Sequence, residues 1–174
     1  MPRAVDALLL IGPPGAGKSF LGRHLAAVGV AHYVELEPIL AERFGRGENF
    51  QARIAEAGAF LWRSYVEQLA SSPLTVAIES TGVGDRRLLD ALQRRYLVRF
   101  VRVEAPRDVC ALRVVSRGAD GNISASEDPE RVGRFFDAWC ERIAPSFRFD
   151  ETVDGTDLAS ATRAIRGILG RTEG

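Results

Sequence analysis

The sequence predicts an α/β fold built on a parallel β-sheet. Five apolar runs typical of strands alternate along the chain with segments of helical periodicity. A glycine-rich turn follows the first apolar run and precedes the first helical segment, as expected of a phosphate-binding turn. With 174 residues and 46% hydrophobic content, the chain can bury one core, so we expect a single domain over 1–174.

The expected strands are short apolar runs bounded by turn residues. The strand expected at 5–11 contains the apolar run Ala7–Ile11. The run at 74–78 is uninterrupted, which is typical of a buried strand in a parallel sheet. Arg99 and Arg102 interrupt a third run at 97–103, which favours a place near the sheet edge. The two remaining strands are expected at 32–36 and 148–153.

Helices are expected in the intervals between the strands. Several begin at a proline or at a capping residue, because these residues suit the first turn of a helix. The expected helices run from the glycine-rich turn to about 29, and over 39–44, 49–70, 85–95, 106–115, 129–143 and 157–169. In the first helix, Phe20, Leu21, Leu25 and Val28 are expected to face the core.

The glycine-rich turn carries the chemistry that the sequence specifies best. Its residues match G-x-x-x-x-G-K-[ST], and backbone N–H groups at such a turn point toward phosphate oxygens. Lys18 is expected to reach the β- and γ-phosphates, and the Ser19 hydroxyl to bind Mg²⁺. The residues expected to hold the nucleotide are Gly12, Pro13, Pro14, Gly15, Ala16, Gly17, Lys18, Ser19 and Phe20.

Lys18 is the only lysine in the sequence, and the other basic residues are all arginine. A compact ammonium suits a phosphate-binding turn better than a planar guanidinium does. The composition therefore points to the same residue as the motif.

Composition excludes several other classes of protein. Lys and Arg together number 23, as do Asp and Glu, so no basic excess indicates nucleic acid as a partner. No apolar run approaches the roughly 20 residues of a membrane span, and the first residues do not resemble a signal peptide. Cys110 and Cys140 lack the spacing of a zinc site. We expect a cytoplasmic protein, a monomer or homodimer, with no membrane or nucleic-acid partner.

Carboxylates follow two of the expected strands. Glu35 and Glu37 lie at the end of the strand at 32–36, and Glu79 directly follows the apolar run that ends at Ile78. Ligands of open α/β sheets bind at this edge, so each carboxylate could hold Mg²⁺ or the hydroxyl to be activated. Two other readings stay open: Glu37 could only favour the start of a helix, and Glu79 could point to solvent.

A polar segment separates two of the expected helices. Residues 116–130 are rich in Gly, Ser and Asp and show no strand pattern, which is typical of a lid over an active site. Arg113 and Arg117 precede this segment and lie four residues apart, so they share one face of their helix.

Taken together, these motifs resemble the P-loop small-molecule kinases of the nucleoside-monophosphate-kinase-like group, and most closely shikimate kinase. Glu35-Leu36-Glu37 stands in the place of the family's D-x-D, and Ser80-Thr81-Gly82 in the place of its glycine triplet. Arg63 is in register with the arginine of the substrate helix, and Arg117 resembles the lid arginine. Arg142 resembles the arginine after the lid, with one additional residue in the spacing before Pro145.

The resemblance implies a three-layer P-loop NTPase fold with sheet order 2-3-1-4-5, using ATP and Mg²⁺ to phosphorylate a small acceptor, one that carries an anionic group. It implies catalytic roles for Lys18, Glu35, Glu79 and Arg117, and metal binding by Ser19 and Glu35. Adenine is expected near Arg113, Asp154 and Gly155. The acceptor is expected at Glu37, Arg63, Ser80, Thr81, Gly82 and Arg142.

Other functions remain open beside a shikimate-kinase-like activity. The same core could serve a nucleoside, nucleotide or antibiotic kinase, or a module that binds nucleotide without catalysis. A GTPase is excluded, because its base-reading motif Asn-Lys-x-Asp needs a lysine beyond Lys18.

Overall fold

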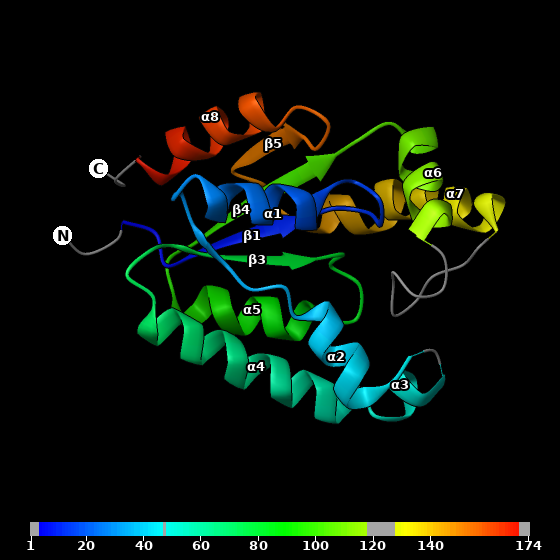
Figure 1. Cartoon of the computed structure of the whole chain (residues 1–174), viewed down its shortest axis with the longest axis horizontal. Coiled ribbons are helices and arrows are strands. Elements are labelled where there is room, and N and C mark those ends of the chain that lie inside the picture. Colours follow the sequence, from blue (N-terminus) through cyan, green and yellow to red (C-terminus); the bar gives the residue numbers. More distant parts are fainter. Residues whose placement is uncertain (1–3, 47, 118–127, 171–174) are drawn as a thin grey trace.

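The computed structural model describes residues 4–46, 48–117 and 128–170, and it has three layers with a parallel sheet in the middle (Figure 1). The strand order is β2-β3-β1-β4-β5, and every pairing is parallel. The strands are β1 Ala7–Ile11, β2 His32–Tyr33, β3 Val76–Ser80, β4 Val98–Glu104 and β5 Glu151–Asp154. The predicted fold class and strand order are therefore confirmed.

Helices cover both faces of the sheet. The first face is covered by α1 Lys18–Ala27 and α8 Leu158–Leu169, and the second by α4 Ile54–Ser71 and α5 Arg86–Arg95 (Figure 1). Each face has its own apolar core cluster, and the residues of β1 alternate between the two. The central strand is thus buried on both sides, which explains its uninterrupted apolar run.

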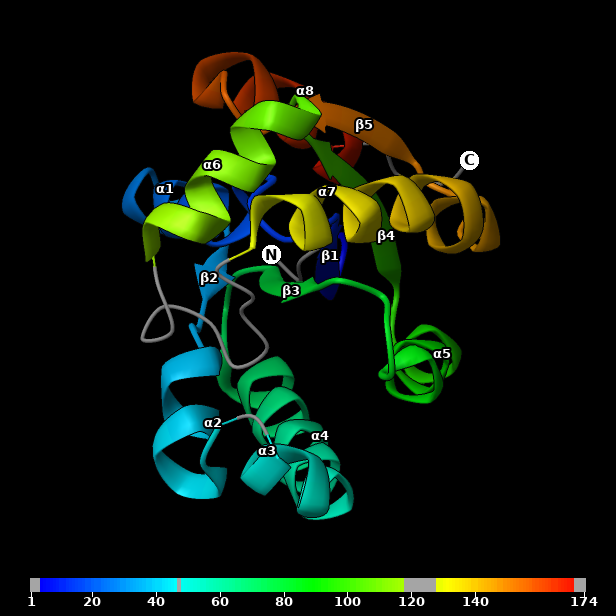
Figure 2. The same ribbon diagram turned by 90° about the vertical axis from the view of Figure 1, so that its right-hand side faces the viewer.

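Two further groups of helices extend beyond the sheet. In Figure 2, α2 Glu37–Phe44 and α3 Glu48–Ala52 lie beside the start of α4, and a small apolar cluster around Leu40, Phe44 and Ala57 holds α2 against α4. On the other side, α6 Arg107–Arg117 packs against α7 Pro129–Ala138. The structure thus places two helical groups on either side of the carboxyl end of β1.

Some element boundaries differ from the sequence-based prediction. The strand expected at 32–36 pairs only through His32 and Tyr33, because β2 is an edge strand and the chain turns into α2 at Glu37. The helix expected over 49–70 is broken at Arg53 into α3 and α4. No Gly or Pro marks this break, so the sequence pattern did not reveal it.

The predicted inner face of α1 was partly wrong. Leu21 and Leu25 are fully buried, but Phe20 is 54% exposed and Val28 is 41% exposed. Phe20 lies about 100° around the helix from Leu21, and Val28 follows the last helical residue. Only the two leucines, one turn apart, therefore reach the sheet.

Most of the predicted lid, over 118–127, lies outside the described residues. After α7 the chain continues into the π-helical turn η2 Trp139–Ile143 and the short 3₁₀ helix η3 Ala144–Ser146. A π turn accommodates one additional residue, which matches the longer spacing between Arg142 and Pro145. No helix in the described part of the chain has the length and apolar content to span a bilayer.

Candidate active site

The P-loop, residues 12–19, connects the carboxyl end of β1 to α1. Gly15 and Gly17 have φ values of +81° and +98°, a backbone conformation that side chains other than glycine rarely adopt. Both glycines also contact other elements closely. A Cβ atom at Gly15 would lie 2.8 Å from Cys110 Cα, and one at Gly17 would lie 2.7 Å from Gly155 O. The loop is therefore enclosed by α6 and by the turn after β5.

Lys18 is buried within this loop. Its Nζ donates hydrogen bonds to Gly12 O at 2.9 Å and to Pro13 O at 2.8 Å. Burial lowers the pKa of Lys18, while the negative charges of Glu79 and Glu37 oppose this effect and the positive charge of Arg117 adds to it. The pKa of Lys18 thus depends on its burial in the P-loop and on charges from β3, α2 and α6.

Glu79 lies next to the P-loop, because β3 pairs with β1 and places Glu79 beside Leu10. Ser19 Oγ donates a hydrogen bond of 2.8 Å to Glu79 Oε2, and the Tyr33 hydroxyl donates one of 2.6 Å to Glu79 Oε1. A hydroxyl and a carboxylate side by side are hard oxygen donors of the kind that Mg²⁺ prefers. These two residues therefore fit the metal that the P-loop motif implies.

The other two predicted carboxylates have different surroundings. Arg23 Nη1 lies 2.8 Å from both carboxylate oxygens of Glu35, and both side chains are partly exposed. Glu37 begins α2, and its charge reaches Lys18. Among the three glutamates, Glu79 is the one in hydrogen-bond contact with the P-loop serine.

The residues predicted for adenine lie around the outer side of the P-loop. Arg113 Nη1 donates to Gly15 O at 3.1 Å. Gly155 N donates to Glu104 O at 2.7 Å, and the glycine lies against Ala16 O so closely that a Cβ atom would overlap it. Hydrogen bonds from Thr156 lower the pKa of Asp154. Arg113 and the turn at 154–156 thus meet at the P-loop backbone. Phe20, by contrast, is largely exposed.

The segment after β3 is held by internal contacts. Ser80 Oγ donates to Asp85 Oδ2 at 2.5 Å and accepts from Gly82 N at 2.7 Å. Trp139 Nε1 donates to Thr81 O at 2.7 Å. The Phe147 ring covers Gly82, where a Cβ atom would lie 2.7 Å from the ring. This segment therefore joins β3 to η2 and to the chain after η3.

The two arginines predicted for the acceptor are not brought together by direct contacts. Arg63 lies on the exposed side of α4, and Arg142 is exposed on η2. Neither has a hydrogen bond or an ion pair within the described residues. They lie on different elements and could approach only through a ligand.

Sequence reasoning missed two residues of this region. Tyr33 contacts Glu79 across 46 positions of sequence, so no local pattern marks the pair. Asp85 is largely buried, which raises the pKa of its carboxyl group, and its Oδ1 has no hydrogen-bond partner among the described residues. Asp85 immediately precedes α5, where its side chain could cap the helix, but its carboxylate accepts a hydrogen bond from Ser80 Oγ instead.

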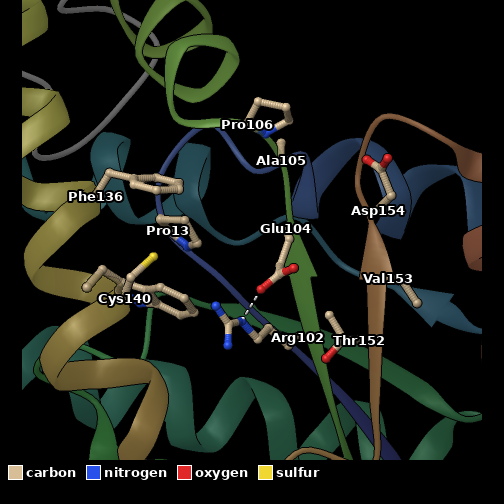
Figure 3. Close-up of a pocket in the computed structure, with 11 residues that line it drawn as sticks. Pro13, Arg102, Glu104, Ala105, Pro106, Phe136, Cys140, Thr152, Val153 and Asp154 are labelled. Atoms are coloured by element: carbon tan, nitrogen blue, oxygen red, sulfur yellow. Dashed lines mark ion pairs between the residues drawn. The ribbon is translucent and has the colours of Figure 1, made fainter.

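A cavity of about 530 Å³ borders the P-loop on the second face of the sheet (Figure 3). Its floor carries Arg102 and Glu104, whose Nε and Oε1 lie 2.6 Å apart, and its wall carries Phe136 and Trp139. The Arg102 guanidinium lies 5.5 Å from the centre of the Trp139 ring. Pro13 also lines the cavity. The P-loop is therefore covered by α6 and the turn after β5 on one side and borders the cavity on the other.

Comparison with known proteins places these features in a family. The model of the family described as "AAA domain" (AAA_33) matches residues 8–143, which is most of the chain and includes the P-loop and Glu79. The chain belongs to the AAA_33 family. The match runs from β1 to η2, and thus contains the P-loop, Glu79 and the helices α4 and α6, but not the turn at 154–156.

Several proteins similar to this AAA_33 domain are kinases. It is 26% identical to a guanylate kinase of Gluconobacter oxydans over 185 residues, covering 97% of this chain and 88% of that protein. The solved structure of shikimate kinase from Bacteroides thetaiotaomicron superposes with a TM-score of 0.63 at 19% identity, covering 95% and 98% of the two chains. A gluconokinase structure from Sinorhizobium meliloti gives a TM-score of 0.59 at 18% identity, with coverages of 97% and 94%. The fold is that of the P-loop small-molecule kinases.

Proposed function

We propose that this protein is an ATP- and Mg²⁺-dependent kinase that transfers the γ-phosphoryl group to a hydroxyl or phosphate group of a small anionic molecule. The observation that carries the proposal is the hydrogen bond between Ser19 and Glu79 beside the buried Lys18. This arrangement supplies the three side chains that a P-loop kinase needs at the β- and γ-phosphates. The kinase identities of the similar proteins support it.

In this proposal the P-loop amides and Lys18 bind the phosphates. Lys18 would exchange its hydrogen bonds to Gly12 O and Pro13 O for phosphate oxygens, and the α1 N-terminus adds a favourable dipole. Ser19 and Glu79 would hold Mg²⁺, which when bound neutralises phosphate charge. Arg113 and the turn at 154–156 would bind adenine, and Arg117 would approach the transferred phosphoryl group at the end of α6.

The acceptor side is assigned to Glu37 and to two arginines. Glu37 lies at the start of α2 and its charge acts on Lys18, so we assign it to binding of the acceptor. Glu35 or Glu79 would orient the acceptor group or take its proton. Arg63 and Arg142 would bind the anionic part of the acceptor, because guanidinium groups bind carboxylate and phosphate in a bidentate manner.

Two acceptor classes deserve separate tests. The structural similarity to shikimate kinase and gluconokinase favours a hydroxylated carboxylic acid. The similarity to a guanylate kinase favours a nucleoside monophosphate. In both classes the acceptor carries an anion that Arg63 and Arg142 would bind.

The experiment is ADP release from ATP and Mg²⁺ with a panel of shikimate, gluconate, nucleosides, nucleoside monophosphates and aminoglycosides. Wild type is compared with Lys18→Ala, and Arg166→Ala on the exposed side of α8 serves as the control. We expect turnover with one acceptor class, a loss of about 100-fold or more in Lys18→Ala, and none in the control. Equal activity of wild type and Lys18→Ala would refute the proposal.

A further inference from the structure

We infer that Tyr33 is a positioning residue for Glu79: its hydroxyl holds the carboxylate in the orientation that binds Mg²⁺ with Ser19. The inference rests on the proposed function, since it concerns the same metal site. It adds Tyr33 of β2 to a proposed metal site that otherwise consists of Ser19 and Glu79.

The geometry fixes Glu79 from two directions. Ser19 donates to Oε2 at 2.8 Å and Tyr33 donates to Oε1 at 2.6 Å, so each carboxylate oxygen has its own donor. The proposed metal ion would bind the Ser19 oxygen, which lies on the Oε2 side of the carboxylate. The Tyr33 hydroxyl lies on the other oxygen and can keep its hydrogen bond.

The length of the side chain makes such a restraint useful. Glutamate has one more rotatable bond than aspartate, so its carboxylate must lose more conformational freedom to hold a metal ion in one place. A hydrogen bond to the oxygen away from the metal reduces that loss before the ion arrives. Groups that orient metal ligands in this way commonly contribute 10-fold to 100-fold to metal affinity.

The position of Tyr33 is itself determined by a glycine of α1. A Cβ atom at Gly22 would lie 2.6 Å from Cδ2 and Cε2 of the Tyr33 ring. The ring therefore packs directly on the backbone of α1, in the helix that begins with Lys18 and Ser19. A glycine in the middle of a helix is unfavourable for the helix, and here it admits the ring.

The first test is the variant Tyr33→Phe, which keeps the ring against Gly22 and removes only the hydroxyl. Tyr96→Phe, at the end of α5, is the matched control. Calorimetry measures ADP affinity with EDTA and with Mg²⁺, and electron paramagnetic resonance measures Mn²⁺ binding to the ADP complex. We expect about a 10-fold loss of metal-dependent affinity in Tyr33→Phe. ADP affinity in EDTA should change by less than about 2-fold.

A second variant reaches the same contact from α1. Gly22→Ala would displace the Tyr33 ring and so disturb its hydrogen bond to Glu79, and Gly58→Ala in α4, where nothing lies within 4 Å of a Cβ atom, is its control. We expect Gly22→Ala to lose metal-dependent affinity as Tyr33→Phe does, and Gly58→Ala to retain it.

The outcomes separate this inference from the proposed function. If wild type binds ADP more tightly with Mg²⁺ and Tyr33→Phe shows the same enhancement, the role of Tyr33 is refuted while the kinase proposal stands. If wild type gains nothing from Mg²⁺, the metal site fails, and both fall together. Equal losses of affinity in EDTA and in Mg²⁺ would also refute positioning, because they indicate general damage to the nucleotide site.

Discussion

Ser19 Oγ lies 2.8 Å from Glu79 Oε2, and this hydrogen bond joins the start of α1 to the end of β3 across 60 positions of sequence. It depends on the parallel pairing of β1 with β3, which brings residue 79 beside residue 10. A shift of one residue in this pairing would turn Glu79 toward the other face of the sheet. The position of the carboxylate that we propose as a metal ligand is thus determined by the sheet register.

Exchange of Glu79 for glutamine should weaken Mg²⁺ binding and so lower turnover. Glu79→Gln keeps the size of the side chain and removes its charge, so we expect turnover at fixed Mg²⁺ to fall by about 100-fold. Glu35→Gln is the matched control, because Glu35 pairs with Arg23 on the surface. Steady-state rates measured over a range of Mg²⁺ concentration check the prediction. A larger loss in Glu35→Gln would instead support Glu35 as the metal ligand.

The two arginines on α6 should affect different kinetic constants. Arg117→Ala is expected to lower kcat by about 10²-fold to 10³-fold with little change in ATP affinity, because it would act on the transferred phosphoryl group. Arg113→Ala is expected to raise the KM for ATP, because Arg113 contacts the P-loop at Gly15 O. Kinetics at saturating acceptor measure both constants, and the reverse pattern would exchange the two roles.

A methyl group at position 155 should disturb the P-loop. In Gly155→Ala the new Cβ atom would overlap Ala16 O. Because Cβ is attached directly to the backbone and Ala16 O is a backbone atom, neither can rotate away, so the turn must move. We expect the free energy of unfolding to fall by about 1–3 kcal/mol and nucleotide binding to weaken. Gly167→Ala is the control, since nothing lies within 4 Å of a Cβ atom there. It should stabilise α8 by about 0.5–1 kcal/mol in chemical denaturation.

Asp85 should make stability depend on pH. Burial raises the pKa of this carboxyl above its ordinary value of 3.8, so the folded state binds the proton more tightly than the unfolded state does. Its contribution to the free energy of unfolding therefore decreases as pH rises between these two pKa values. In Asp85→Asn this decrease should be absent. Denaturant titrations at several pH values, with Asp90→Asn on the same helix as control, measure the difference between the variants.

The features that the sequence predicted correctly are the local ones. The P-loop motif, the apolar runs and the alternation of strand and helix each lie within a few residues, so patterns reveal them. The start of α7 at Pro129 agrees with the expected boundary. These signals are sufficient to predict the fold class, whereas the strand order was predicted from the resemblance to P-loop kinases.

The remaining features depend on contacts between distant residues. Neither the Tyr33–Glu79 hydrogen bond nor the different surroundings of the three glutamates can be predicted from residue spacing, because each depends on sheet register and burial. The break at Arg53 and the π turn at Trp139–Ile143 result from packing and from one additional residue. The directions of Arg63 and Arg142 likewise could not be read from a helical pattern.

Lys18 is the only lysine of the protein, and its side chain is buried in the P-loop. Burial lowers the pKa of Lys18, so a larger fraction is in the neutral, nucleophilic form than for a lysine in water. An ATP analogue with an acyl phosphate would place its electrophile beside this amine and acylate it. No other lysine exists to compete, so the mass of the modified peptide would report nucleotide occupancy of this site alone.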